Sequence, residues 1–157
     1  MTVAEWCLLA AVLLYLGTLA VPKALAPRDF NNAAPRDPGF YEHPVRKRAL
    51  GAHINGIETF PFFAAAVLLA EFRAAPQSWI DGLAIGFITA RLLFVWAYVS
   101  DRPTARTVLW NVAFAFNIGM FFLSGYGPAG ARIGTLVGLA WAIALWQLLS
   151  RLPRHPS

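Results

Sequence analysis

Charged side chains are scarce in this 157-residue chain, in which Lys, Arg, Asp and Glu together make up 13% of the residues. Soluble globular domains carry about 25% charged residues, so the composition excludes an ordinary soluble domain. Cysteine is represented only by Cys7, which excludes a disulfide within the chain. The first apolar stretch has no basic residue before it and contains Glu5, which argues against a cleaved signal peptide. We therefore expect this stretch to be retained as a membrane anchor.

Apolar residues, in contrast, make up 58% of the chain. They gather in runs near the length of ~20 residues that crosses a bilayer as a helix. Five such runs lie at about Val3–Val21, Ile54–Ala70, Trp79–Val99, Val108–Phe122 and Ile133–Leu149. Because short connections join antiparallel neighbours, we predict an all-α membrane protein, an up-and-down four-helix transmembrane bundle with a fifth, C-terminal apolar helix. The alternative for the fifth segment, which glycines dilute, is a re-entrant or surface-lying helix.

The first connection differs from the other, short ones, because residues 22–48 contain five prolines. Proline fixes φ and removes a backbone donor, so we predict an extended polar loop over this range. The chain then divides into a four-helix membrane domain at residues 1–125, which includes the loop, and a C-terminal addition at residues 126–157. The addition contains three glycines spaced four residues apart, Gly130, Gly134 and Gly138. This spacing favours the close approach of another helix.

Basic residues are unevenly distributed among the connections. The first and third connections and the C-terminal tail together hold ten of the thirteen Lys and Arg residues. If the chain crosses the membrane five times, these regions share one side, and the positive-inside rule places that side in the cytoplasm. The same rule explains the net charge of +5 without nucleic-acid binding. Basic loop residues such as Arg102 are expected to contact lipid head groups.

Two polar residues, Asn55 and Glu58, lie at the start of the second apolar run. A carboxylate within a membrane-spanning helix is costly without a partner, so Glu58 marks a functional site. On an α-helix Arg48 and Gly51 fall on the same stripe as these two residues. Arg48 precedes Glu58 by ten residues, which is about 15 Å along the axis. Glu58 therefore needs a partner from another helix, another subunit or a ligand.

The third apolar run offers such a partner. Arg91 and Tyr98 share one helical face, and Arg91 lies too deep in the run for its charge to reach the membrane surface. We predict that Arg91 is the counter-charge of Glu58. A buried Arg–Glu pair that only specifies helix packing is the alternative interpretation. Arg106 begins the fourth run on the same side of the membrane, and we expect it to join the site.

The second run opens on a pattern that resembles the signature of the MAPEG family, the membrane-associated proteins of eicosanoid and glutathione metabolism. The residues that carry this resemblance are Arg48, His53, Asn55, Glu58 and Pro61. The region between the third and fourth runs is similar to that of bacterial members, and the matching residues are Arg91, Tyr98, Asp101, Arg102, Pro103, Thr104 and Arg106. The resemblance covers roughly residues 1–125.

The resemblance implies a four-helix subunit that assembles as a homotrimer and binds glutathione, its co-substrate, between subunits near the cytosolic face. It implies an integral protein of the bacterial inner membrane, with the site on the cytoplasmic side. The residues that it assigns to glutathione binding are Arg48, Asn55, Glu58, Arg91 and Tyr98. Glu58 would hold the amino group of the peptide, and Arg106 would stabilise the thiolate as the catalytic residue. No metal ligand is implied.

The chemistry of glutathione suits these residue types. A fixed cation lowers the pKa of a thiol, and the thiolate is the nucleophile. We therefore expect a membrane-embedded, glutathione-dependent transferase or peroxidase that acts on hydrophobic electrophiles or lipid hydroperoxides. Two departures from the family pattern favour an alternative, a non-catalytic multi-pass protein with a structural Glu–Arg pair. Gly51 stands where many members have a second arginine, and Phe94 stands where several have a tyrosine.

Overall fold

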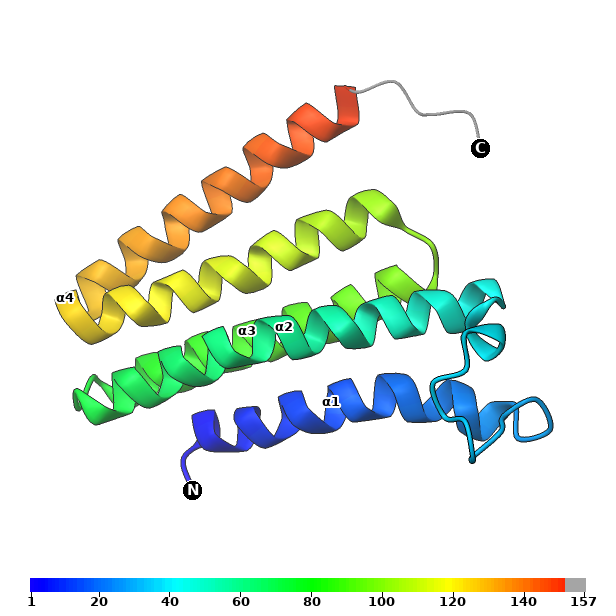
Figure 1. Cartoon of the computed structure of the whole chain (residues 1–157). Coiled ribbons are helices and arrows are strands. Elements are labelled where there is room, and N and C mark those ends of the chain that lie inside the picture. Colours follow the sequence, from blue (N-terminus) through cyan, green and yellow to red (C-terminus); the bar gives the residue numbers. More distant parts are fainter. Residues whose placement is uncertain (152–157) are drawn as a thin grey trace.

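The computed structural model describes residues 1–151, the side chain of Leu149 excepted. The elements are α1 (Val3–Leu25), the 3-10 helix η1 (Pro38–Tyr41), α2 (Pro44–Phe72), α3 (Gln77–Val99) and α4 (Pro103–Arg151) (Figure 1). The described residues contain no strand, and all four α-helices are long and apolar enough to cross a membrane. The prediction of an all-α, multi-pass membrane protein is confirmed. The predicted basic tail beyond Arg151 lies outside the described residues.

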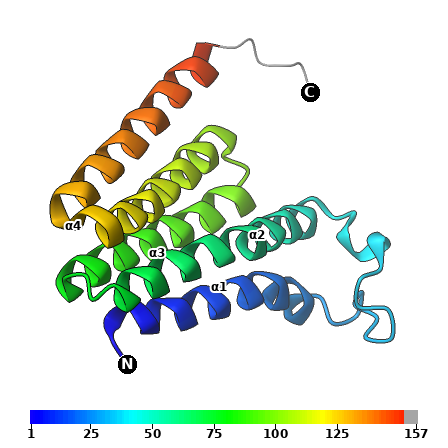
Figure 2. The same cartoon turned by 60° about the vertical axis from the view of Figure 1, so that its left-hand side comes forward.

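Helix α4 consists of two helical segments joined at Gly127, whose φ of 65° and ψ of −160° are not helical. Glycine adopts a positive φ without the steric cost that a side chain imposes. The chain folds back at this point, so that residues 128–151 run opposite to residues 103–126 (Figures 1 and 2). The predicted fifth helix is therefore the second half of α4, and residues 128–151 are called the C-terminal segment below.

Glycines of the C-terminal segment allow it to pack closely on the first half of α4. A Cβ atom added to Gly138 would lie 2.6 Å from the Cβ atom of Ala115, and one added to Gly134 would lie 3.1 Å from the Cβ atom of Phe122. Such small residues let two helix backbones approach closely. The helix approach predicted from the four-residue spacing is thus present, and its partner is the preceding half of the same helix.

The polar loop between α1 and α2 is shorter than the predicted range of residues 22–48. Helix α1 continues through Pro22 to Leu25, and α2 already begins at Pro44. Proline is tolerated in the first turn of a helix because its missing N–H group would have no acceptor there. The connection therefore spans only residues 26–43, and Arg48 belongs to the beginning of α2.

The rotation of α2 is fixed by two contacts in the core. The rings of Phe63 on α2 and Phe87 on α3 stack with their centroids 4.0 Å apart. On the side facing α1, a Cβ atom added to Gly56 would lie 2.4 Å from the ring of Tyr15, so the ring occupies the space that glycine leaves. These contacts determine which direction the polar face of α2 points.

The connections alternate between the two ends of the bundle, as antiparallel crossings require. The polar loop, the turn between α3 and α4 and the end of α4 lie toward one end, and the N-terminus, the turn between α2 and α3 and the kink of α4 lie toward the other (Figures 1 and 2). The first and third connections predicted from the sequence, which are richer in basic residues than the second and fourth, therefore share one end of the molecule.

Candidate functional site

A cleft of about 620 Å³ lies between α2, α3 and both halves of α4. We call it the polar cleft; it is lined by Gly51, Ile54, Asn55, Glu58, Phe94, Tyr98, Arg106, Thr107, Trp110, Asn111, Trp141 and Leu145. Its volume falls within the range typical of small-molecule sites. The structure thus brings together four of the residues predicted for the site, Asn55, Glu58, Tyr98 and Arg106.

The polar cleft contains one carboxylate and one guanidinium from different helices. Glu58 comes from α2, its side chain is exposed, and no ion pair within the described residues includes it. Arg106 comes from α4, is half-buried and holds its guanidinium carbon 4.6 Å from the ring centroid of Tyr98. This cation–π contact fixes the arginine without neutralising its charge. Both charges are therefore available to a ligand in the cleft.

Arg48 does not line the polar cleft. Its Nε atom donates to the carbonyl oxygen of Val99 at 3.0 Å, and its guanidinium lies 3.5 Å from the carboxylate of Asp101. Val99 is the last residue of α3, and a cation is favoured at the C-terminal end of a helix. Arg48 thus ties the beginning of α2 to the end of α3, beside the cleft.

Arg91 also lies outside the polar cleft, and it does not pair with Glu58 as predicted. It is only 1% exposed, and its Nη1 atom donates to Oδ1 of Asn55 at 2.9 Å. Its guanidinium carbon lies 4.2 Å from the ring centroid of Phe94 and 5.6 Å from that of Tyr15. Arg91 therefore packs into the aromatic core between helices, whereas Glu58 is exposed one turn further along α2. The structural Glu–Arg pair of the alternative interpretation is absent from the described residues.

The contact with Arg91 determines how Asn55 faces a ligand. An amide has one oxygen acceptor and one nitrogen that donates two hydrogen bonds. Because the oxygen of Asn55 accepts from Arg91, its nitrogen is the group left to a ligand. Asn55 thus presents a donor to the polar cleft, beside the acceptor oxygens of Glu58.

A smaller cavity of about 270 Å³ lies behind the polar cleft and shares Asn55, Glu58 and Trp110 with it. Arg91 lines this inner cavity, and its Nε and Nη2 atoms have no hydrogen-bond partner within the described residues. The same holds for Oδ1 of Asn117. A buried polar group without a partner is costly, so Arg91 and Asn117, which both line the inner cavity, retain unused hydrogen-bonding capacity.

Gly51 and Tyr98 fit each other across the interface of α2 and α3. A Cβ atom added to Gly51 would lie 2.6 Å from the hydroxyl oxygen of Tyr98, and Phe94 packs edge-on against the Tyr98 ring with the centroids 5.6 Å apart. The Tyr98 hydroxyl therefore fills the space beside Gly51, the position at which the sequence departs from the MAPEG pattern. The two residues that depart from the family pattern, Gly51 and Phe94, thus both lie against Tyr98.

We expect Gly51→Ala to destabilise the protein, because the new methyl group displaces Tyr98. Tyr98→Phe removes the closest atom. The double variant should therefore lose less unfolding free energy than the two single variants together, with a coupling of about 0.5–3 kcal/mol. Thermal unfolding of the four proteins in detergent measures this coupling. Gly82→Ala is the control, since a Cβ atom there meets nothing within 4 Å. Strictly additive effects would contradict the contact.

Several residues that line the polar cleft or the inner cavity were not predicted from the sequence. Asn111 and Asn117 carried a signal, because amides are rare in an otherwise apolar membrane segment. In the structure Nδ2 of Asn111 donates to the carbonyl oxygen of Thr107 at 2.8 Å. Trp141 and Leu145 carried no signal, since they reach the polar cleft only because the chain folds back at the kink.

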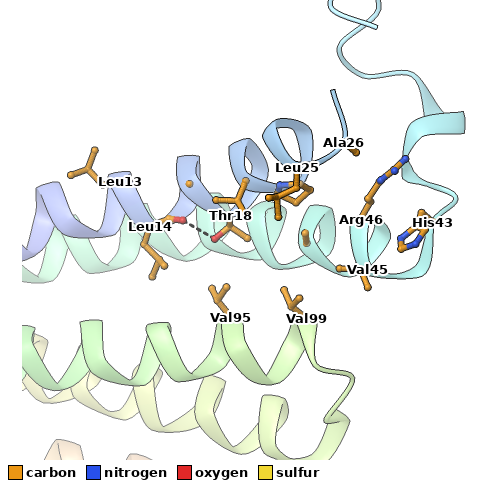
Figure 3. Close-up of a pocket in the computed structure, with 14 residues that line it drawn as sticks. Leu13, Leu14, Thr18, Leu25, Ala26, His43, Val45, Arg46, Val95 and Val99 are labelled. Carbon is orange, nitrogen blue, oxygen red and sulfur yellow. Dashed lines mark hydrogen bonds between the residues drawn. The ribbon is translucent and has the colours of Figure 1, made fainter. Parts of the chain in front are cut away.

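A separate cavity of about 680 Å³ lies between α1, α2 and α3 and has a different character (Figure 3). Its walls are mainly aliphatic, and its polar lining residues are Thr18, His43 and Arg46. The Thr18 hydroxyl donates to the carbonyl oxygen of Leu14, and Arg46 is paired with Asp29. Arg46 in this cavity is thus already paired, whereas the polar cleft offers charged groups without an ion-pair partner within the described residues.

Comparison with protein-family models gives a match to the MAPEG family over residues 3–126. The match includes α1 to α3 and the first half of α4, and it ends before the C-terminal segment. It contains all the residues that the sequence predicted for the site. Comparisons with curated proteins and with solved structures give no match.

Proposed function

The chain belongs to the MAPEG family, and on this premise we propose that it is a membrane-embedded, glutathione-dependent transferase or peroxidase acting on hydrophobic electrophiles or lipid hydroperoxides. The observation that carries the proposal is the polar cleft, in which Glu58 and Arg106 are both free of ion pairs within the described residues. Glutathione has an ammonium group for the carboxylate and a thiol for the guanidinium. Glu58 and Arg106 line the same cleft, so one bound peptide could engage both.

The polar side chains on α2 would bind the peptide part of glutathione. The carboxylate of Glu58 accepts hydrogen bonds from the ammonium group, and the amide nitrogen of Asn55 donates to a carboxylate or carbonyl oxygen. Arg91 acts through Asn55, because it holds the amide in the orientation that turns the nitrogen toward the cleft. Arg48 likewise acts from outside the cleft by fixing the end of α3, on which Tyr98 lies.

Arg106 would ionise the thiol. A guanidinium stays protonated when partly desolvated, so its charge stabilises the thiolate inside the cleft. In the transferase reaction the thiolate sulfur forms a bond to the electrophilic carbon, the leaving group departs with its electron pair, and the thiol proton passes to solvent. In the peroxidase reaction the sulfur attacks the terminal peroxide oxygen, the O–O bond breaks, and the alkoxide leaves and is protonated. The thiol of a second glutathione then attacks the sulfenic sulfur, which forms the disulfide and releases the oxygen as water.

The membrane setting follows from the same proposal. A hydrophobic acceptor is concentrated in the bilayer and reaches the sulfur from the lipid side, whereas glutathione arrives from water. We place the site at the cytoplasmic side of a bacterial inner membrane, where the basic connections belong. In a homotrimer, a neighbouring subunit would cover the exposed side of Glu58.

The test is a glutathione titration of the purified protein in detergent, followed by the ultraviolet absorbance of the thiolate. We expect saturable binding and thiolate formation near neutral pH. An excess of S-methyl glutathione, which has no thiol, should compete for the site without adding absorbance. No binding at millimolar glutathione would refute the proposal.

A further inference from the structure

The polar cleft has two chemically different walls. The first wall comes from α2, α3 and the start of α4, and it contains the charged and hydrogen-bonding groups of Asn55, Glu58 and Arg106. The opposite wall includes Trp141 and Leu145 of the C-terminal segment. The charged groups of the polar cleft thus belong to the first wall, whereas Trp141 and Leu145 offer mainly apolar surface.

The second wall is held in place by close helix packing. Besides the contacts at Gly134 and Gly138, a Cβ atom added to Gly119 would lie 2.1 Å from the hydroxyl oxygen of Thr135. These contacts join residues 115–122 to residues 134–138, so the C-terminal segment is set against about two turns of the first half of α4. Side chains on a helix packed in this way have defined positions relative to the cleft.

The side chains of the second wall are available for a ligand. Trp141 is 65% exposed although it lines the cleft, and Leu145 is half-buried. Trp110 from the first half of α4 continues the same surface, and its ring stacks on Phe114 with the centroids 5.3 Å apart. Indole rings offer a large apolar contact area and favourable stacking to planar groups.

We propose that the C-terminal segment is part of the functional site and that Trp141 and Leu145 bind the apolar acceptor. This inference rests on the proposed function, because it assigns the other half of the cleft to glutathione. The acceptor class that fits is a compact apolar electrophile with a planar group, held against the indole ring in the same cleft as Arg106. The C-terminal segment lies beyond the family match, which ends at residue 126, so this wall is added to the common fold.

The test compares Trp141→Ala with Trp146→Ala in the full-length protein. Trp146 lies on the same segment and is 47% exposed, but it does not line the polar cleft. A nitro-substituted aryl halide serves as the probe, because it is both an electrophile and a quencher of indole fluorescence. Trp110, which stays in the cleft in both variants, reports binding. Loss of apolar contact in a pocket is expected to weaken acceptor binding and raise its KM by about tenfold in Trp141→Ala only.

A second pair of variants, Leu145→Ala and Leu148→Ala, repeats the comparison if the tryptophan variant fails to fold, since Leu148 is exposed and outside the cleft. Glutathione binding, followed by thiolate absorbance, should stay unchanged in all four variants. Equal acceptor affinity in Trp141→Ala and Trp146→Ala overturns the inference. If the unmodified protein binds no glutathione but its affinity for the aryl halide still depends on Trp141, the proposed function fails while the acceptor wall stands.

Discussion

Arg106→Ala is expected to remove the thiolate absorbance of bound glutathione and to lower turnover by about 100- to 1,000-fold. The Arg106 guanidinium lines the polar cleft, and no carboxylate within the described residues forms an ion pair with it. Without it the pKa of the bound thiol rises, because the thiolate loses its stabilising charge. Absorbance titrations between about pH 6.5 and 10.5, roughly two units either side of the pKa of a free thiol, measure this shift in the unmodified and variant proteins.

Arg102→Ala is the matched control for this experiment. Arg102 is close in sequence, but its guanidinium carbon lies 5.6 Å from the ring centroid of Trp96 and it does not line the polar cleft. The Arg102→Ala variant should therefore retain both the thiolate absorbance of bound glutathione and the turnover. Arg106→Lys retains the charge without the planar fork of donors and should fall between the two variants. A normal thiolate signal in Arg106→Ala would exclude Arg106 as the catalytic residue.

Glu58→Gln is expected to weaken glutathione binding by about 10- to 100-fold, because it removes a charged acceptor while keeping the size of the side chain. The defect should appear in the affinity for glutathione rather than in the ionisation of the bound thiol, since Arg106 is unchanged. Calorimetric titration in detergent measures the affinity. Glu42→Gln is the control, because Glu42 is an exposed carboxylate that does not line the polar cleft.

An analogue of glutathione without its amino group makes the Glu58 experiment specific. If Glu58 binds the ammonium group, the unmodified protein should lose affinity for the analogue, whereas Glu58→Gln should bind both peptides about equally. This double comparison isolates the pairwise interaction from any general damage to the site. Equal discrimination between the two peptides by both proteins would place the ammonium group elsewhere.

The structure also changes the interpretation of the two arginines that were predicted to contact the ligand. Arg91 was placed in the site as the counter-charge of Glu58, and Arg48 because it shares a helical stripe with Glu58; the family resemblance assigned both to glutathione binding. In the structure one donates to Asn55 and the other to Val99. In the proposed site we therefore assign both arginines a positioning role, and no ion pair within the described residues compensates the charge of Glu58.

The hydropathy and helical periodicity of each segment were sufficient to predict the apolar helices and the polar face of α2. The length and apolar character of each run depend only on the residues within it, and so does the stripe formed by Asn55 and Glu58, because helical periodicity fixes their relative directions. The antiparallel order followed from the short connections. The boundaries were less accurate: Pro44 was assigned to a loop, yet proline is tolerated in the first turn of a helix. Pro22 was assigned to the same loop, although α1 continues through it to Leu25.

The sequence by itself therefore determined a multi-pass helical membrane protein with a carboxylate and an amide on one helical face. Only the tertiary structure decided that Arg91 contacts Asn55 instead of Glu58, because that choice depends on the rotation of α2 against α3. It also decided that Trp141 enters the cleft, more than 80 residues after Glu58 in the sequence. That contact requires the chain to reverse at Gly127, and neither composition nor periodicity specifies where a reversed helix will meet distant side chains.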